Sequence, residues 1–324
     1  MISLSDSSVA TTSFAFDRAT QTTYLGETPN GITCFKGTAS LDWAIGEVPN
    51  VSYVVALMTD SVLQHFSQRY QKHTVALNCF FFRKTLAAPF IIEIEPLKMS
   101  SKGYCVVKVS LKQSKDPRSS TVPSSIDQYD PTIYVEKVHG IFTMGNMDNE
   151  QGVTHFHDAP KAPTKDTMVP YKYVFMGEFL TSKLDMSTAP RQPDGSLATP
   201  KSAEILPGKP EVSHSMQFSD GRPIDFKSMP YWCDMFITPP ALLGPNILGG
   251  PVWCPTMQLE VQFKRVPSGK EILGHYKAPH IINGRFDLDG EVFDSEGNLL
   301  ALTRHQCLVV PWSRNSKTTP KARI

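Results

Sequence analysis

The sequence lacks an excess of either charge and lacks a long apolar run. Lys and Arg together number 32 and Asp and Glu 31 among 324 residues, so the chain has no electrostatic footprint for nucleic acid or an anionic membrane. No stretch approaches the length of a membrane span. The N-terminus has no basic start followed by an apolar run, so secretion is not indicated.

Closely spaced cysteines are also missing. The six cysteines lie far apart, with no CxxC pair, at positions 34, 79, 105, 233, 254 and 307. This spacing predicts buried free thiols in a reducing compartment and argues against a disulfide framework or a zinc site. The cluster His155-Phe156-His157-Asp158 has metal-donor types but lies in a polar segment without a distant partner motif. We therefore expect neither a metal nor a cofactor.

What the chain does contain is an internal repeat. The segments 78–84 and 258–265 are strand-like runs that each end in an aromatic residue and two cations. In each copy a glycine lies 21 residues after that aromatic, Gly103 after Phe82 and Gly284 after Phe263. An apolar helical stretch precedes each run. This pattern of a helix followed by antiparallel strands occurs twice in the chain and predicts two copies of one α+β unit.

The first copy is predicted to begin with two short strands within 22–36, around the turn Thr28-Pro29-Asn30-Gly31. Asn50 offers an N-cap to a helix that reaches about Tyr70, because apolar residues from Val51 to Phe66 form one stripe at helical spacing. Strands are expected at 74–84, 90–98, 103–113 and 133–143.

The second copy is predicted to open with an extended segment at 171–180. A helix is expected over about 226–236, stopped by Pro239-Pro240. Strands follow at 256–266, 271–276, 284–294 and 299–311, with a hairpin turn at 294–298.

These elements predict an α+β fold of the double-hotdog type, in which each long helix is wrapped by an antiparallel sheet. We divide the chain into an N-terminal unit at 1–150, a linker at 151–170 and a C-terminal unit at 171–324. The segment near 187–209 is rich in Pro, Gly and Ser and is expected to be a flexible insertion.

Three residues of the second copy have side chains suited to chemistry. Asp234 lies in an apolar turn, where a carboxylate is costly to bury unless it is paired or hydrogen-bonded. It is a general base or water-orienting group, or else an aspartate on the wet edge of its helix or bonded to a nearby amide. His305 shares its strand face with small and apolar residues and is either a titrating partner or a satisfied core histidine. Thr256 opens its strand on the opposite parity from Leu259 and Val261, so its hydroxyl faces either a cleft or, as parity alone favours, water.

With these residues in view, the chain resembles the acyl-CoA thioesterase-like double-hotdog family, including the bacterial thioesterase II type and its fungal relatives. Tyr231-Trp232-Cys233-Asp234-Met235 is similar to the helix segment that carries the family's catalytic aspartate. The run 255–265 is similar to the strand whose leading Thr or Ser helps to hold the lytic water. The run 294–309 resembles the closing hairpin, where the family commonly has glutamine and this chain has His305.

The helix start also resembles the family, with a departure. Pro49-Asn50-Val51-Ser52-Tyr53 stands where relatives usually read Asn-Gly-Gly-Tyr, so both glycines are replaced. The resemblance implies hydrolysis of an acyl thioester, acyl-CoA above all, by water activated by Asp234 with Thr256 and His305. It places Asn50, Tyr53 and Trp232 at the substrate. Because the Asp60 of the first copy lies on the polar side of its helix, one active site per pair of units is expected.

Two other functions stay open at this point. The scaffold could carry a non-hydrolytic acid/base reaction, such as a dehydration or cyclisation in a biosynthetic pathway, with Asp234 and His305 as the pair. It could also bind acyl groups without turnover, since a fold alone does not separate these functions. Ala322-Arg323-Ile324 follows the small-basic-aliphatic pattern of the peroxisomal tripeptide, so the expected location is peroxisomal or cytoplasmic. The oligomeric state is open, a homo-oligomer included.

Overall fold

The chain is seen in a computed structural model that describes residues 14–116, 118, 121–199 and 201–316. Its first half contains helices α1 (Ala15–Thr20) and α2 (Val51–Phe66) and strands β1 (Thr23–Glu27), β2 (Thr33–Thr38), β3 (Ala44–Ile45), β4 (Val48–Pro49), β5 (His73–Phe81), β6 (Pro89–Lys98), β7 (Cys105–Ser114) and β8 (Tyr134–Gly145). Its second half contains helices α3 (Met229–Trp232) and α4 (Pro245–Leu248) and strands β9 (Met168–Pro170), β10 (Leu180–Asp185), β11 (Glu211–Phe218), β12 (Val252–Trp253), β13 (Thr256–Phe263), β14 (Glu271–Lys277), β15 (Arg285–Asp294), β16 (Leu299–Leu308) and β17 (Val310–Pro311).

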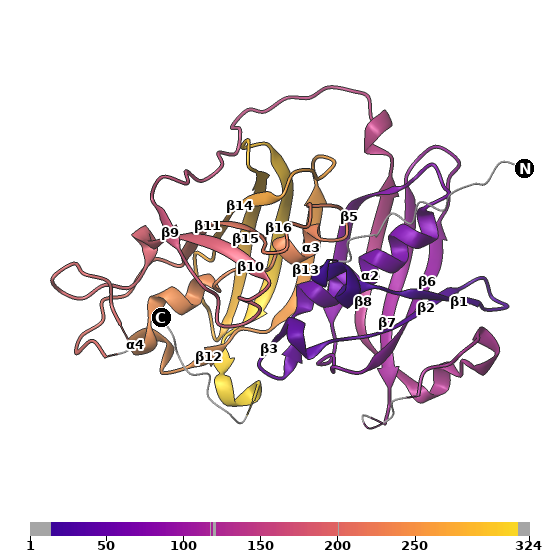
Figure 1. The fold of residues 1–324 in the computed structure, drawn as a ribbon, viewed down its shortest axis with the longest axis horizontal. Coiled ribbons are helices and arrows are strands. Elements are labelled where there is room, and N and C mark those ends of the chain that lie inside the picture. Colours follow the sequence, from indigo (N-terminus) through magenta and orange to yellow (C-terminus); the bar gives the residue numbers. More distant parts are fainter. Residues whose placement is uncertain (1–13, 117, 119–120, 200, 317–324) are drawn as a thin grey trace, which may run out of the picture.

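The main element is one 13-stranded sheet in the order β1-β2-β6-β7-β8-β5-β13-β16-β15-β14-β11-β10-β9. The strands of the two halves occupy separate sides of this sheet and meet where β5 pairs with β13 (Figure 1). That pairing is antiparallel and sets Gln258 opposite Phe80 and Gln262 opposite Ala76. The two segments of the internal repeat therefore lie side by side at the centre of the sheet. Joining the halves in this way leaves neither β5 nor β13 as an exposed edge strand.

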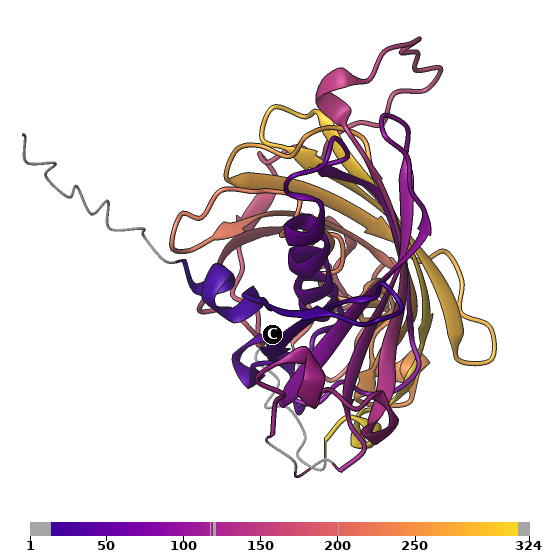
Figure 2. The same ribbon diagram turned by 90° about the vertical axis from the view of Figure 1, so that its right-hand side faces the viewer.

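Helix α2 runs through the hollow of the curved sheet (Figure 2). The Asn50 Oδ1 accepts hydrogen bonds from the backbone N–H groups of Ser52 at 2.9 Å and Tyr53 at 3.3 Å, so the expected N-cap is confirmed. Of its 16 residues, 11 are buried, including Val54, Met58 and Val62 of the predicted stripe, while Val51 at the start of the stripe is partly exposed. The helix ends at Phe66, a few residues before the predicted end at Tyr70.

Helix α3 is far shorter than the predicted helix at 226–236. A single turn, Met229–Trp232, has α-helical geometry. The Met229 amide donates to the Asp225 carbonyl at 3.1 Å, but Pro230 has no N–H group, so the helical hydrogen bonds are interrupted at the next residue. After Cys233 the chain continues as irregular turns toward Pro239. The apolar residues that suggested a long helix are buried because both the turn and the segment after it lie in the core.

One apolar core extends across both halves of the molecule, and aromatic rings join the two helices within it. Trp43 lies between Tyr53 of α2, at 6.0 Å between ring centroids, and Tyr231 of α3, at 5.4 Å. At the other end, the Lys227 Nζ lies 3.5 Å from the Asp60 Oδ1 of α2. The two helices thus run antiparallel, and the residues that follow α3 lie toward the N-terminal end of α2.

The predicted long strands correspond to β5–β8 and β13–β16, with ends displaced by a few residues. The expected extended segment at 171–180 is wrong, because residues 171–179 form irregular turns and the strand begins at Leu180. Strand β11 was not predicted. Its inward residues Val212, His214, Met216 and Phe218 follow the period-two pattern that marks a strand.

The division into units at 1–150 and 171–324, with the linker and the flexible insertion at 187–209, stays a prediction. Two observations bear on those segments. Strand β9 lies within the expected linker and pairs with β10, and Arg191 of the insertion makes isolated β-bridges to Leu197 and Leu206.

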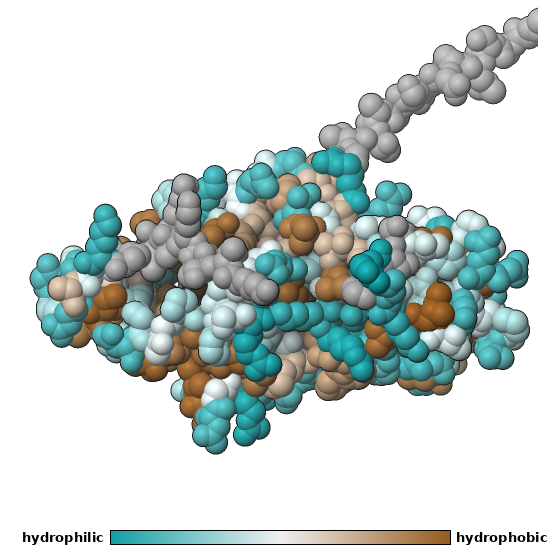
Figure 3. All heavy atoms as spheres, turned by 90° about the horizontal axis from the view of Figure 1, so that it is seen from below, coloured by the Kyte–Doolittle hydropathy of each residue, from teal (hydrophilic) through white to brown (hydrophobic). Residues whose placement is uncertain are grey.

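The outer surface alternates between hydrophilic and hydrophobic side chains, as the view from below shows (Figure 3). Among the helices of the described residues, none has the length and apolarity needed to cross a bilayer. The tripeptide Ala322-Arg323-Ile324 lies outside the described residues, so its role in peroxisomal targeting stays a prediction.

Candidate active site

Asp234 and His305, 71 residues apart in sequence, meet on the inner side of the sheet. Asp234 follows α3, and His305 points inward from β16. The His305 Nδ1 lies 3.3 Å from the Asp234 Oδ1, with side-chain exposures of 0% and 9%. The oxygen lies off the hydrogen-bonding direction of the ring, so Nδ1 is a buried nitrogen without a hydrogen-bond partner. A carboxylate beside an unsatisfied imidazole nitrogen is an arrangement suited to proton transfer.

The other ring nitrogen of His305 is held on two sides. Its Nε2 lies 2.9 Å from the Thr303 Oγ1 and 3.2 Å from the carbonyl oxygen of Cys233. The Phe236 ring packs edge-on against the imidazole at 5.6 Å. The alternative of a fully satisfied core histidine therefore describes one nitrogen of this ring and not the other.

Thr256 faces the interior, so the parity expectation that turned it toward water is wrong. The pairing of β13 with β16 shifts register between Thr256 and Gln258, which identifies Met257 as the extra residue of a β-bulge. A bulge reverses the alternation of the strand and re-aims the side chain at its end. Thr256 is consequently buried and lies opposite Cys307, whose Sγ donates to the Thr256 Oγ1 at 3.7 Å.

Cys307 lies between Thr256 and His305, because it contacts Thr256 and follows His305 by two positions on the same strand face. Burial holds the pKa of the Cys307 thiol well above its ordinary value; the hydrogen bond to Thr256 opposes the shift and the nearby Asp234 carboxylate adds to it. Burial likewise raises the pKa of Tyr231 and of Tyr276, with Asp234 adding to both shifts. The Cys307, Tyr231 and Tyr276 side chains near Asp234 are thus neutral.

The three residues expected at the substrate are all buried. The Tyr53 hydroxyl donates to the Ala19 carbonyl at 2.8 Å and accepts from the Ser40 amide at 3.1 Å. Asn50 caps α2, as described above. Trp232 packs against Phe218, and its indole N–H is buried without a partner. These contacts assign structural roles to Asn50 and Tyr53, and direct contact of any of the three with substrate stays a prediction.

The first copy arranges its helix carboxylate differently. The Asp60 Oδ2 accepts hydrogen bonds from the Thr22 amide at 2.9 Å, the Thr22 hydroxyl at 2.7 Å and the Gln64 side chain at 2.8 Å. Its other oxygen faces Lys227. The Asp60 carboxylate is thus engaged in a network of structural hydrogen bonds and an ion pair, which supports the expectation of one active site per pair of units.

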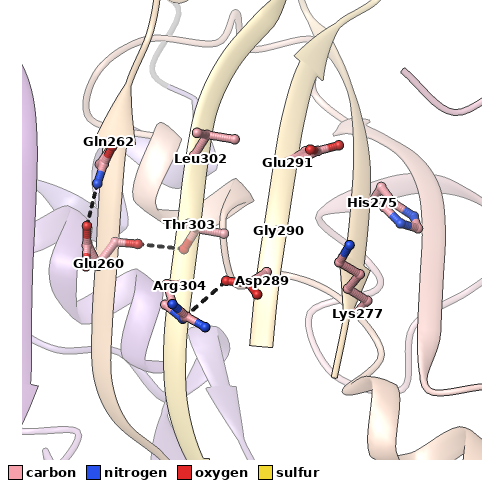
Figure 4. Close-up of a pocket in the computed structure, with 10 residues that line it drawn as sticks. All are labelled: Glu260, Gln262, His275, Lys277, Asp289, Gly290, Glu291, Leu302, Thr303 and Arg304. Carbon is pink, nitrogen blue, oxygen red and sulfur yellow. Dashed lines mark hydrogen bonds and ion pairs between the residues drawn. The ribbon is translucent and has the colours of Figure 1, made fainter. Parts of the chain in front are cut away.

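A depression lies on the outer face of the sheet, a cavity of about 410 Å³ lined by Gly290 and Thr303 among others (Figure 4). Its walls carry Glu260, Lys277, Asp289 and Arg304. It is open and highly charged, which does not suit an acyl chain, and it is separated from Asp234 by the sheet. Thr303 is shared by this cavity and the inner site. No three His, Cys, Asp or Glu side chains within the described part of the chain are placed to hold a metal ion.

Pattern reasoning missed Thr303 and Cys307 as members of the site. Both share the strand parity of His305, and that parity was the signal that could have found them. The contact of Thr303 with Glu260 and that of Cys307 with Thr256 depend on partners distant in sequence.

Comparison with known proteins identifies the scaffold. Residues 39–125 match the model of the acyl-CoA thioesterase N-terminal domain, and residues 154–309 match the model of the acyl-CoA thioesterase C-terminal domain. A search of the curated proteins found no match.

Solved structures share the fold along nearly their whole length. A conserved hotdog-fold protein of unknown function from Alicyclobacillus acidocaldarius superimposes with a TM-score of 0.68 at 19% identity, covering 91% of this chain and 98% of its own. The acyl-CoA thioesterase II TesB2 from Mycobacterium marinum gives a TM-score of 0.62 at 15% identity, with coverage of 92% and 98%. The tesB protein from Mycobacterium avium subs paratuberculosis gives 0.59 at 11% identity, with coverage of 91% and 98%. The expected double-hotdog fold is confirmed, and the two matched domains show that this chain belongs to the acyl-CoA thioesterase family.

Proposed function

We propose that this protein hydrolyses acyl thioesters, with acyl-CoA as the substrate class, at the site formed by Asp234, His305 and Thr256. The observation that carries the proposal is the buried His305 Nδ1 without a hydrogen-bond partner, 3.3 Å from the Asp234 Oδ1. A buried acceptor beside a carboxylate requires a donor, and water is the donor that a hydrolase must bind.

A single bound water donates one of its hydrogens to Asp234 and its second hydrogen to the His305 Nδ1. Its oxygen lone pair is then free to attack the thioester carbonyl carbon. The Thr256 hydroxyl, which accepts the weak S–H of Cys307, retains its own hydrogen for the water oxygen or the substrate. As the oxygen–carbon bond forms, the water proton passes to the Asp234–His305 pair. Collapse of the tetrahedral intermediate breaks the carbon–sulfur bond, and the thiolate takes up that proton.

The developing oxyanion is assigned to the N-terminus of α2. Asn50 occupies the amides of Ser52 and Tyr53, whereas no hydrogen bond found among the described residues uses the amide of Val51. The antiparallel helices bring the segment after α3 toward this end of α2. An N–H group at the positive end of a 16-residue helix stabilises negative charge on a carbonyl oxygen. The valine and serine that replace the usual glycines leave the backbone donor in place.

The test is release of free thiol from a series of acyl-CoA chain lengths. Asp234→Asn should lower kcat by about 10²- to 10⁴-fold, because the amide cannot accept the proton. Asp289→Asn is the matched control, since Asp289 pairs with Arg304 on the outer face of the sheet and should tolerate the change. A folded wild-type protein that releases no thiol would refute the hydrolase proposal. Full activity of Asp234→Asn would refute the assignment of Asp234 to the active site.

The pairing of Asp234 with His305 also favours a second candidate, an acid/base enzyme such as a dehydratase or cyclase. Such a reaction would leave the thioester intact and change the mass of the acyl group, by loss of one water for a dehydration. Mass spectrometry of the same reactions separates the two functions. Tight acyl-CoA binding with neither product would indicate a non-catalytic acyl-binding protein.

A further inference from the structure

Thr303 lies two residues before His305 on β16, and its side chain points to the same inner face. The side chain is buried, and its Oγ1 lies 2.9 Å from the His305 Nε2. Which of the two atoms donates this hydrogen bond decides where the imidazole carries its proton.

The hydroxyl hydrogen of Thr303 is already committed. It is donated to the main-chain carbonyl of Glu260 on the neighbouring strand at 2.7 Å (Figure 4). A threonine hydroxyl has one hydrogen, so toward His305 it can only accept. The second neighbour of Nε2 is the Cys233 carbonyl oxygen at 3.2 Å, which can never donate. Two acceptors thus face one nitrogen, and that nitrogen must carry the hydrogen.

The opposite tautomer places hydrogen on Nδ1 and gains a contact with the Asp234 carboxylate. It also turns the Nε2 lone pair toward the Cys233 carbonyl and pulls the Thr303 hydroxyl away from Glu260. The buried Cys233 carbonyl then loses the hydrogen bond from the ring, and the part-buried Glu260 carbonyl loses the one from the Thr303 hydroxyl. Both losses cost free energy. The Asp234 oxygen lies off the direction of an Nδ1–H bond. The contact with Asp234 therefore recovers little of the free energy lost at the two carbonyl oxygens.

We infer that Thr303 is a positioning residue that keeps the Nε2 proton of His305 in both charge states, so that Nδ1 is the nitrogen that exchanges protons with Asp234 and the bound water. The catalytic consequence rests on the proposed hydrolase function, whereas the tautomer itself does not.

The packing around Thr303 holds its hydroxyl in this orientation. Gly290 of β15 pairs with Thr303, and a Cβ built on Gly290 would lie 2.7 Å from the Thr303 Cγ2. The missing side chain at 290 thus makes room for the threonine methyl group. Because a β-branched side chain has few χ1 choices, fixing the methyl group also fixes the hydroxyl.

Asp234 is the charged group that faces His305. The other titratable side chains near the pair are Cys233, Tyr231, Tyr276 and Cys307. Burial raises the pKa of each, and Asp234 adds to each shift. They therefore stay neutral and add no further charge beside His305.

Thr303→Val removes the hydroxyl at nearly constant shape, and Thr303→Ser retains it. With ¹⁵N-labelled histidine, long-range ¹H–¹⁵N correlation spectra at a pH where the ring is neutral report the tautomer, and His305→Gln assigns the His305 signal. We expect the Nε2–H form for wild type and Thr303→Ser, and a substantial Nδ1–H population for Thr303→Val.

The kinetic readout should follow the spectra. In Thr303→Val, kcat should fall about tenfold, the effect of one hydrogen bond to a charged group, with little change in KM. Thr303→Ser should restore kcat, whereas a loss of general packing would not be recovered by the smaller hydroxyl side chain.

An Nδ1–H tautomer in the wild type overturns the inference, as does an unchanged tautomer in Thr303→Val. If Thr303→Val fails to fold, the wild-type and Thr303→Ser spectra still decide the tautomer. A wild type that shows the Nε2–H form but releases no thiol sinks the hydrolase proposal and leaves the positioning role of Thr303 intact.

Discussion

Arg222 donates hydrogen bonds from its Nε and Nη2 to the Asp17 Oδ1, at 3.0 and 2.8 Å. The same guanidinium binds Asp225 at 2.7 Å and lies over the rings of Phe16 and Phe218. It thereby ties the N-terminal helix α1 to the segment that leads into α3 and Asp234. A buried cation with two carboxylates and two ring faces thus fixes the segment that precedes Asp234 from outside the candidate site.

Arg222→Met should therefore lower the free energy of unfolding by about 2 kcal/mol in urea denaturation. Breaking a buried pair costs more, but the partner carboxylates are partly exposed, which reduces the penalty. Arg118→Met is the control, because the Arg118 side chain is 91% exposed and its pair with Asp116 spans 3.5 Å. That variant should change stability by less than about 0.5 kcal/mol. Equal effects of the two substitutions would contradict the anchoring role.

Removal of the α2 cap is a second prediction. Asn50→Ala leaves the Ser52 and Tyr53 amides without their acceptor and should cost about 1 kcal/mol of unfolding free energy. Asn50→Ser keeps a capping oxygen and should recover most of the loss. If thiol release falls in Asn50→Ala and returns in Asn50→Ser, the cap also orients the Val51 amide.

His214 should make the protein sensitive to acid. Burial lowers the pKa of His214 to about 3 in the folded state, against about 6.5 in an unfolded chain. Between these values the unfolded chain binds a proton that the folded protein does not, so stability is retained above about pH 6.5 and declines as the pH falls toward 3.

The measurement is urea denaturation across this pH window. His214→Phe should flatten the decline, even if its stability at neutral pH is lower because the contact with Tyr173 is lost. His157→Phe, in an exposed loop, should keep the wild-type slope. A wild-type slope in His214→Phe would show that other groups cause the acid sensitivity.

Gly290 should tolerate no side chain. A Cβ at this position would lie 2.5 Å from the Tyr276 Cδ1 and 2.7 Å from the Thr303 Cγ2, so Gly290→Ala should cost about 1–3 kcal/mol through overpacking. The cost should shrink in a Tyr276→Leu background, because the ring that the new methyl group meets is gone. Additive losses in this double-mutant cycle would exclude direct crowding against Tyr276.

Much of the scaffold follows from local pattern. The α2 stripe from Val51 to Phe66 with its Asn50 cap, the central strands of the repeat and the hairpin after Asp294 each depend on residues close together in sequence. At that hairpin the Asp294 Oδ1 accepts from the amides of Glu296 and Asn298 at 3.0 and 2.8 Å, a local interaction that residue types predict. The pairing of Asp234 with His305 was suggested by resemblance, and only the fold brings the two side chains together.

The sequence by itself determined the two α+β copies and the inward face of His305, because helical and strand periodicity are local properties of the chain. Only the tertiary structure decided two features of the candidate site: the inward face of Thr256 and the protonated nitrogen of His305. Each depends on a partner distant in sequence. Pairing with β16 creates the bulge at Met257, and the carbonyl oxygens of Glu260 and Cys233 determine where the imidazole proton lies. No periodicity within a single segment can encode contacts of that range.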